Sequence, residues 1–383
     1  MIRYHKFLIA LMLIGLLLLA ACTLDFSYEK DVDEVDIIEE VWNTLHEQYV
    51  DLEQLDDERL LEGAIRGMVS EIEDPYTNYL GPQENALSLS ELEGDFSGIG
   101  ATLTMEDDQL KVVAPIKDSP AAEAGIKPGD IILAVDGVDT SKMNLVEAVL
   151  NIRGKKGTPV TLKVLHPDEQ EPVEIEIVRA EIKLPSVRWE MRSDAIAHIT
   201  VTNFSNRTGS EFETALEEMK EAGVAATVLD LRDNPGGIVD AAVEVAGQFL
   251  DGEMVIYALD NKGKQEEWYA RSGGLALDIP LVVLVNEHSA SASEVVAGAL
   301  QDHERGWLVG VTTYGKGTMN LVNELSNGGS LYVTFARWFT PLGRQIDDKG
   351  ITPDYQVEMT SEDIENEIDP QLEVAVEYLR LKL

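Results

Sequence analysis

The chain is poor in cysteine and in basic residues, and each shortage excludes something. Its single cysteine, Cys22, rules out an intramolecular disulfide, so export would not imply a disulfide framework. Thirty Lys and Arg residues stand against 70 Asp and Glu residues, which gives a formal net charge of −40. Because nucleic acid and anionic bilayer surfaces repel so acidic a protein, we expect neither as a partner. The acidic excess fits a cation-rich substrate, a saline habitat or simple solubility.

The sequence also lacks the residue spacing of a metal site. No cluster of His, Cys and carboxylate residues has metal-ligand spacing, so we expect no metal and no other cofactor. Apolar residues, in contrast, make up 44% of the 383 positions. This amount is sufficient for the packed cores of two or three domains.

The first residues predict the compartment. Arg3 and Lys6 precede an unbroken apolar stretch of 15 residues, Phe7 to Ala21, which is too short to span a membrane comfortably. It ends in Leu-Ala-Ala-Cys at positions 19–22, which resembles the lipobox before which bacterial signal peptidase II cleaves. We therefore expect a lipid on Cys22 and a lipoprotein held at the outer face of a membrane of the bacterial cell envelope. An ordinary signal peptide or an N-terminal anchor remains the alternative.

A helical region follows the acidic linker. Apolar residues recur at helical spacing from Val35 to Val69, and the helix is expected to end near Asp74-Pro75-Tyr76 because proline stops a helix. The apolar stripe fits packing on the rest of the chain or on a second subunit.

A serine and a lysine suggest nucleophilic catalysis. Ser291 lies between an apolar run at Leu281–Val285, which predicts a buried strand, and a second run at Val295–Leu300, which predicts a buried helix. A nucleophile at such a turn has the N–H groups of a helix N-terminus beside it, and these stabilise an oxyanion. Lys316 fits the base that the serine needs, provided that burial lowers its pKa. On its own the pair favours a serine-rich helix cap and a solvated lysine, because its spacing carries no stringent geometry.

Five segments that include this pair resemble one family. They occur in the order Leu229–Gly237 (LDLRDNPGG), Ser289–Glu294 (SASASE), Gln301-Asp302, Tyr314–Gly317 (YGKG) and Phe339–Arg344 (FTPLGR). Together they resemble the C-terminal processing peptidases, the tail-specific serine proteases of family S41, from about Val35 onward. The resemblance implies Ser291 as nucleophile, Lys316 as general base, and an oxyanion hole formed by the N–H groups of Gly237 and Ala292. It also implies an α/β core of the ClpP/crotonase-like spiral type and dimerisation through the N-terminal helices.

One position departs from the family pattern. Where the family usually has a glutamine that orients the lysine, this chain has Asn320, which is one methylene shorter. Because a displacement of about an ångström can cost on the order of a hundredfold in rate, three outcomes are open. The backbone compensates, another residue or water replaces the glutamine, or activity is reduced.

Other polar residues near the serine have two interpretations each. Asp302 matches an acidic residue often seen near the family's active site, or it is a structural carboxylate at a helix end. His288 and His303 flank the serine and suggest a Ser/His/Asp triad, but neither occupies the position of the family's base.

The stretch from about Phe96 to Val178 resembles a PDZ domain. Its short strands and turns include Pro128-Gly129-Asp130 and Asp136-Gly137. The glycines of its carboxylate loop would turn backbone N–H groups toward a peptide's terminal carboxylate. That loop is formed by Gly98, Ile99, Gly100 and Ala101, and the apolar lining of the groove is predicted from Ala148, Val149 and Ile152.

Arg153 follows the helix that is predicted to wall this groove. It either forms a solvated salt bridge or contacts the core when a peptide is bound, and so couples the domain to the active site.

The predicted organisation has six parts. They are a lipoprotein signal peptide (1–21), an acidic linker (22–34), an N-terminal helical region (35–92), a PDZ domain (93–178), an S41 protease core (179–360) and a C-terminal helical segment (361–383). Strands at Ile196–Val201 and Ala225–Leu231, with a helix at Ser210–Ala222 between them, are expected in the core.

These patterns are compatible with three functions. The first is an exported, lipid-anchored endopeptidase that captures protein C-termini. The second is a PDZ adaptor with a protease-like scaffold weakened by Asn320. The third applies the Ser/Lys chemistry to a non-peptide ester or amide.

Overall fold

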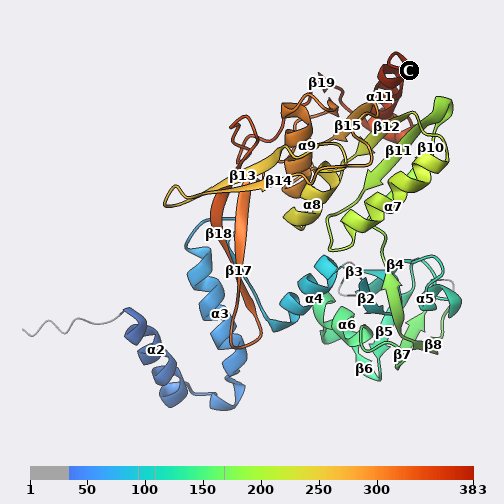
Figure 1. Ribbon diagram of the computed structural model, residues 1–383. Coiled ribbons are helices and arrows are strands. Elements are labelled where there is room, and N and C mark those ends of the chain that lie inside the picture. Colours follow the sequence, from blue (N-terminus) through green and yellow to red (C-terminus); the bar gives the residue numbers. More distant parts are fainter. Residues whose placement is uncertain (1–33, 94, 108, 168) are drawn as a thin grey trace, which may run out of the picture. The chain divides into compact units, whose positions relative to one another are not determined.

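The computed structural model describes residues 34–383 apart from positions 94, 108 and 168 (Figure 1). The signal peptide predicted for residues 1–21, the lipid on Cys22 and nearly all of the acidic linker lie outside the described residues. The chain divides into two compact units, Met1–Gly63 and Ala64–Leu383. Within the part of the chain that the structure describes, no helix combines the length and the apolar character needed to cross a bilayer.

The first unit is helical where it is described. It contains α2 (Glu34–Gln48), η1 (Leu52–Gln54) and the first residues of α3 (Asp57–Ser70), which crosses the boundary between the units. His46 connects the two helices, because its Nε2 lies 2.8 Å from Asp57 Oδ1. The apolar stripe predicted from the sequence is present on α2, and its residues Val35, Ile37, Ile38 and Val41 are exposed.

The second unit contains a six-stranded sheet at the centre of the segment expected to be the protease core. Neighbouring strands are parallel except for the first pair, which is antiparallel. In order across the sheet the strands are β10 (Val187–Met191), β11 (Ile196–Val201), β12 (Ala226–Asp230), β15 (Leu281–Val285), β16 (Trp307–Gly310) and β19 (Tyr355–Gln356).

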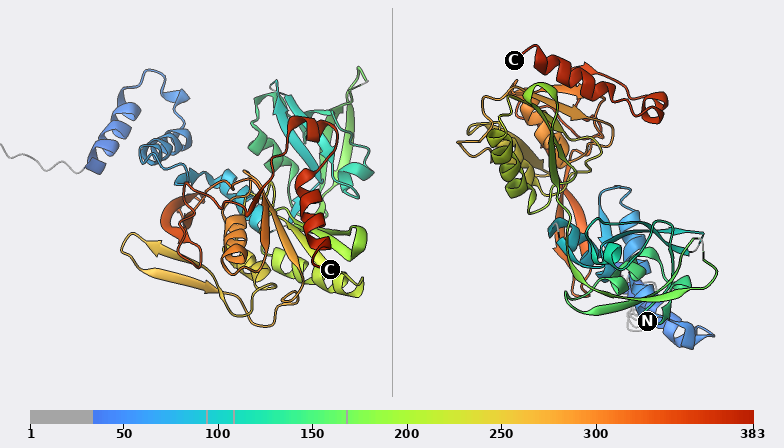
Figure 2. Two further views of the ribbon diagram at one scale, coloured as in Figure 1. Left: turned by 90° about the horizontal axis from the view of Figure 1, so that it is seen from above. Right: turned by 90° about the vertical axis from the view of Figure 1, so that its right-hand side faces the viewer.

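Helices cover both faces of this sheet. Residues of β12 and β15 are buried throughout, because alternate side chains point to opposite faces and both faces are covered. One face packs against α7 (Thr208–Glu221), α8 (Val239–Ala246) and α9 (Ala292–Asp302). The other face packs against α11 (Pro370–Arg380), the red helix near the C-terminus in Figure 2. Short helices η3 (Ser193–Ala195) and α10 (Ser361–Glu365) lie in the connections.

A second sheet carries residues that follow the predicted base. Its central strand β18 (Ser330–Phe339) pairs with three antiparallel neighbours. The other strands are β1 (Asn78–Leu80), β13 (Met254–Asp260), β14 (Gln265–Tyr269) and β17 (Thr318–Glu324).

The segment expected to be a PDZ domain forms a separate sheet that is accompanied by short helices. Its strands are β3 (Ala101–Glu106), β4 (Gln109–Pro115), β5 (Ile131–Val135), β6 (Val138–Asp139), β7 (Pro159–Leu165) and β8 (Val173–Val178), and its helices are α5 (Pro120–Glu123), η2 (Thr140–Lys142) and α6 (Leu145–Ile152). On either side in the sequence, β2 (Asp95–Gly98) pairs with β9 (Ala180–Lys183), and α4 (Pro82–Glu93) precedes them.

Candidate active site

Three neighbouring parallel strands bring the predicted site residues together. β12, β15 and β16 end at the same edge of the sheet, and the loops that follow them contain Gly237, Ser291 and Lys316 respectively. Sites in α/β proteins form at such carboxyl ends of strands. Hydrogen bonds join the loops: Ser289 Oγ donates to Leu231 O at 2.8 Å, and the N–H of Tyr314 donates to Ser289 O at 3.0 Å.

Ser291 occupies a strained turn between β15 and α9. Its φ is 55° and its ψ is −113°, a conformation that costs a non-glycine residue free energy. A sharp strand-to-helix turn of this kind exposes the hydroxyl of a nucleophilic serine in other hydrolases. Ser291 is half-buried, whereas the following residues of α9 are buried from Ala292 to Leu300.

The glycine loop after β12 supplies a backbone N–H near this serine. Gly237 forms a parallel bridge with Phe204, in which the N–H of Phe204 donates to Gly236 O and the N–H of Ile238 donates to Phe204 O. In a parallel bridge the central residue directs its own N–H away from the partner strand. The N–H of Gly237 therefore remains available to a ligand.

The glycine loop lies directly against the nucleophile. A Cβ atom on Gly236 would be 2.8 Å from Ser291 Cβ and 3.0 Å from Ala292 N, so only glycine fits there without a shift. Ala292 is the first residue of α9, and the N–H groups of a first helical turn have no acceptor within the helix. The glycine loop therefore lies against Ser291 and Ala292, and an oxyanion hole formed by the N–H groups of Gly237 and Ala292 remains a prediction.

Lys316 is half-buried beside an aromatic ring. Its Nζ lies 5.2 Å from the centre of the Tyr76 ring. Burial lowers the pKa of Lys316, while the nearby carboxylates of Asp74 and Glu294 act in the opposite direction. The shift is in the direction that a general base requires.

Glu294 connects the nucleophile and the base, a role that was not predicted although Ser291 and Glu294 have the spacing of a helix capping box. Its fully buried carboxylate accepts hydrogen bonds through Oε2 from the N–H of Ser291 at 2.8 Å and the N–H of Lys316 at 2.9 Å. Its Oε1 accepts from Thr313 Oγ1 at 2.6 Å and from the N–H of Gly315 at 2.7 Å. Burial raises the pKa of Glu294, and these four bonds oppose the rise.

Asn320 makes a different contact from the one its position suggested. Its Nδ2 donates to the carbonyl of Tyr76 at 2.5 Å, while its Oδ1 is buried and has no hydrogen-bond partner. Asp74 Oδ1 accepts from the N–H of Tyr76 at 3.0 Å, and Asp74 Oδ2 accepts from Thr77 Oγ1 at 2.6 Å. Asn320 therefore holds the turn that places the Tyr76 ring beside Lys316.

The sequence marked Asp74-Pro75-Tyr76 only as a helix end, so Tyr76 was missed as part of the site. Burial is the main reason that the pKa of Tyr76 rises to about 12, and Tyr314, Asp347 and Asp348 add to the rise. Tyr76 therefore remains neutral at physiological pH and presents an uncharged aromatic ring to the lysine.

The other polar residues considered for the site, Asp302, His288 and His303, have hydrogen-bond partners outside the Ser291 and Lys316 pair. Asp302 ends α9, accepts the N–H of Leu342 at 2.8 Å and pairs with Arg344, so it fixes the loop after β18. His288 is exposed, and its Nδ1 lies 3.1 Å from Asp233 Oδ1. His303 Nε2 lies 2.7 Å from Met254 O. These contacts do not form a Ser/His/Asp arrangement.

The candidate PDZ groove residues occupy two environments. Gly98 ends β2, Ala101 begins β3, Ile99 is buried, and Gly100 has a φ of 75°. The side chains of Ala148 and Ile152 are 0% and 3% exposed and belong to the core of this domain, whereas Val149 is half-buried. Peptide binding by these residues remains a prediction.

Arg153 caps the C-terminus of α6 and points to a residue outside the PDZ sheet. Its Nη1 donates to Ser90 Oγ on α4. Arg153 is half-buried, so its side chain is not purely solvated.

Comparisons with known proteins agree across the chain. Family models match for peptidase family S41 at residues 195–357, for a PDZ domain at 97–177 and for the activating protease CtpB N-terminal domain at 23–83. The carboxy-terminal-processing protease of Bartonella bacilliformis is 38% identical over 324 residues, which cover 83% of this chain and 74% of that protein. The carboxyl-terminal-processing protease of Synechocystis is 37% identical over 347 residues, covering 88% and 81%.

A solved structure supports the same assignment. The photosystem II D1 C-terminal processing protease aligns with a TM-score of 0.51 at 29% identity, covering 85% of this chain and 94% of that chain.

Proposed function

The chain belongs to peptidase family S41, as a serine protease related to carboxy-terminal-processing proteases and carrying a PDZ domain, and we propose that Ser291 and Lys316 form its catalytic dyad. In this proposal the neutral amine of Lys316 takes the proton of Ser291 Oγ as that oxygen attacks the carbonyl carbon of the scissile peptide bond. The N–H groups of Gly237 and Ala292 donate to the oxyanion that forms. The lysine ammonium then protonates the leaving amine, and water hydrolyses the acyl-serine.

The carboxylate of Glu294 is the observation that carries this proposal. One oxygen, Oε2, accepts the backbone N–H of both Ser291 and Lys316, which fixes the two residues relative to one another. The bond to Ser291 is also the capping-box contact of α9, and the bond to Lys316 extends it to a loop 22 positions away. The strained φ of Ser291 and the lowered pKa of Lys316 support the same roles.

The substrate in this proposal is a protein or peptide with a free C-terminus. The PDZ domain would bind the terminal carboxylate through the backbone N–H groups of Gly98–Ala101 and add the peptide as a strand beside β3. The cleaved bond would then lie farther along the same chain, at Ser291.

The proposal also includes attachment to a membrane and assembly into a dimer. A signal peptide at 1–21 and a lipid on Cys22 would hold the enzyme at the outer face of a membrane. The exposed apolar stripe of α2 is available to bind a second subunit, so a homodimer is the proposed assembly.

A second candidate is a PDZ adaptor with a weakened protease site. The hydrogen bonding of Asn320 favours this adaptor. Its Nδ2 donates to the Tyr76 carbonyl, and its Oδ1 has no hydrogen-bond partner. The proposal of a working enzyme rests on the intact serine, lysine and glycine loop.

Cleavage of casein tests the two candidates. The purified protein is expected to degrade casein, and the variants Ser291→Ala and Lys316→Ala are each expected to lose nearly all of that activity while keeping the circular dichroism of the wild type. The double variant should be no worse than either single one, because nucleophile and base act as a unit. Substantial cleavage by Lys316→Ala would rule out the dyad, and no cleavage by the wild type would favour the adaptor.

A further inference from the structure

The guanidinium of Arg232 uses all five of its N–H groups. Nε and Nη2 donate to the two oxygens of Asp230 at 2.9 and 2.7 Å, and Nη1 and Nη2 donate to the two oxygens of Asp369 at 2.9 and 2.8 Å. The remaining N–H, on Nη1, donates to Gln371 Oε1 at 3.0 Å. Bidentate pairs of this kind fix the plane of the guanidinium as well as its position.

Arg232 lies in the loop that leads to the candidate oxyanion hole. It is the second residue after β12, and Gly237 follows it by five positions. Asp233 and Asn234 are also held: the N–H of Asp233 donates to Asn286 Oδ1 at 2.9 Å, Asn234 Nδ2 donates to Val201 O at 2.8 Å, and Asn234 Oδ1 accepts the N–H of Gly236 at 2.9 Å. Several contacts therefore hold the loop before the glycines, and those of Arg232 link it to the C-terminal helix.

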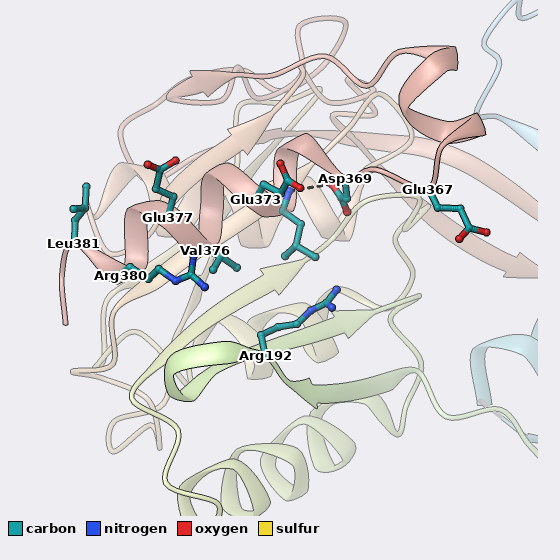
Figure 3. Close-up of a pocket in the computed structure, with 9 residues that line it drawn as sticks. Arg192, Glu367, Asp369, Glu373, Val376, Glu377, Arg380 and Leu381 are labelled. Atoms are coloured by element: carbon teal, nitrogen blue, oxygen red, sulfur yellow. Dashed lines mark hydrogen bonds between the residues drawn. The ribbon is translucent and has the colours of Figure 1, made fainter.

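Asp369 and Gln371 belong to the C-terminal helix. Asp369 is the N-cap of α11, where it also accepts the N–H of Leu372 at 2.9 Å (Figure 3). Gln371 is buried, and its Nε2 donates to Val357 O at 2.8 Å. Leu372, Ala375 and Leu379 pack α11 against the central sheet, so both acceptors are held on a rigid support.

We propose that Asp369 and Gln371 are positioning residues for the oxyanion hole, which they reach through Arg232. Both lie beyond residue 357, where the match to the S41 family model ends. The inference rests on the proposed function, because it assumes that the N–H of Gly237 serves catalysis.

The electrostatics at Arg232 agree with a fixed arrangement. Burial of Asp230 would raise its pKa, but hydrogen bonds from His198 and Arg232 outweigh burial and hold the pKa at about 2. Asp230 is therefore charged at neutral pH and is shared between His198 and Arg232. The charge of Arg232 is shared with Asp369, whose side chain is 32% exposed at the wall of an open groove beside α11.

The variant Asp369→Asn tests the proposal because asparagine remains a good N-cap. The helix keeps its cap, but Arg232 loses one acceptor oxygen and one charge and meets an amide N–H₂ instead. The matched control is Asp194→Asn, which breaks the pair between Asp194 and Arg380 at the other end of α11. Asparagine also tolerates the φ of 62° at position 194.

Four readouts are compared in the full-length protein: kcat, KM, the thermal midpoint, and amide hydrogen exchange of residues 231–238. Asp369→Asn is expected to lower kcat by about ten- to a hundredfold with KM changed little, because a misplaced oxyanion donor affects the transition state. Exchange at 231–238 should become faster, and Asp369→Glu should restore part of kcat. Asp194→Asn should change neither kcat nor that exchange.

The proposal is overturned if the two variants have equal thermal shifts and Asp369→Asn leaves both kcat and the exchange of residues 231–238 unchanged. Asp369 would then be only a helix cap. If the wild type cleaves nothing, the proposed function fails. Hydrogen exchange then still decides whether Asp369 holds the loop, since it needs no substrate.

Discussion

The amine of Lys316 lies 5.2 Å from the centre of the Tyr76 ring. The face of an aromatic ring attracts a cation, and Asp74 and Glu294 also favour the charged amine, whereas burial favours the neutral amine. Burial prevails, since the pKa of Lys316 is lowered. The ring and the carboxylates therefore stabilise the ammonium, but not enough to cancel the effect of burial on the pKa of Lys316.

Asn320 is expected to act on the lysine through the Tyr76 turn. Asn320→Ala should lower kcat by about five- to a hundredfold, because it removes a hydrogen bond to a buried carbonyl that is worth about 1 to 3 kcal/mol. Asn320→Gln should keep or raise kcat, because the family usually has glutamine at this position. Steady-state cleavage of a peptide measures kcat for the wild type and the two variants. Unchanged kinetics in the alanine variant would show that Asn320 has no role in the site.

Glu294→Gln should inactivate the enzyme and destabilise it. The variant replaces one carboxylate oxygen by an amide group that faces backbone N–H donors, and a buried donor without an acceptor costs about 1 to 3 kcal/mol. Urea unfolding and casein cleavage measure the two effects. Glu287→Gln is the control, because it removes the same charge from an exposed position in the loop before Ser291. A fully active Glu294→Gln would show that the shared acceptor does not hold the dyad.

Gly237→Ala should abolish cleavage more than it affects folding. An added Cβ would lie 2.1 Å from Phe204 O, and the φ of 139° is unfavourable for alanine, so the loop must move. Gly67→Ala in α3 is the control, since nothing lies within 4 Å of its added Cβ. We expect the control to cleave casein normally. Normal cleavage by Gly237→Ala as well would place the oxyanion hole elsewhere.

Arg153 is expected to couple the PDZ domain to catalysis through its contact with Ser90. The assay follows cleavage of a short reporter peptide with and without a second peptide that has a free C-terminal carboxylate. The second peptide should stimulate the wild type and the control Lys155→Ala, but not Arg153→Ala, with a coupling free energy of about 1 to 3 kcal/mol. Equal stimulation of all three proteins would leave Arg153 a structural residue, and stimulation of none would limit the PDZ domain to substrate capture.

Local patterns predicted the secondary structure around the site well. Leu281–Val285 and Ile196–Val201 are strands with the bounds expected, because continuous or alternating apolar runs reflect burial directly. The helix expected near Ser291 begins at Ala292. The S41 family, the α/β protease core and the PDZ domain are confirmed by the comparisons.

Contacts between distant segments were not predictable from the sequence. Asn320 meets the Tyr76 carbonyl across 244 positions, and Arg232 meets Asp369 across 137. Neither contact leaves a periodic pattern, because each depends on how sheets and helices pack. The shared acceptor Glu294 was visible only as the sixth residue of the serine motif, since its role depends on a loop 22 positions away.

The pH dependence of kcat/KM tests the Ser/Lys dyad most directly. Only the neutral amine of Lys316 can take the serine proton, and burial lowers its pKa from the ordinary value, so kcat/KM should rise as the pH increases from about 5 to about 9. The acid limb should be absent from the residual activity of Lys316→Ala. A wild-type profile that stays flat down to about pH 5 would contradict a lysine base.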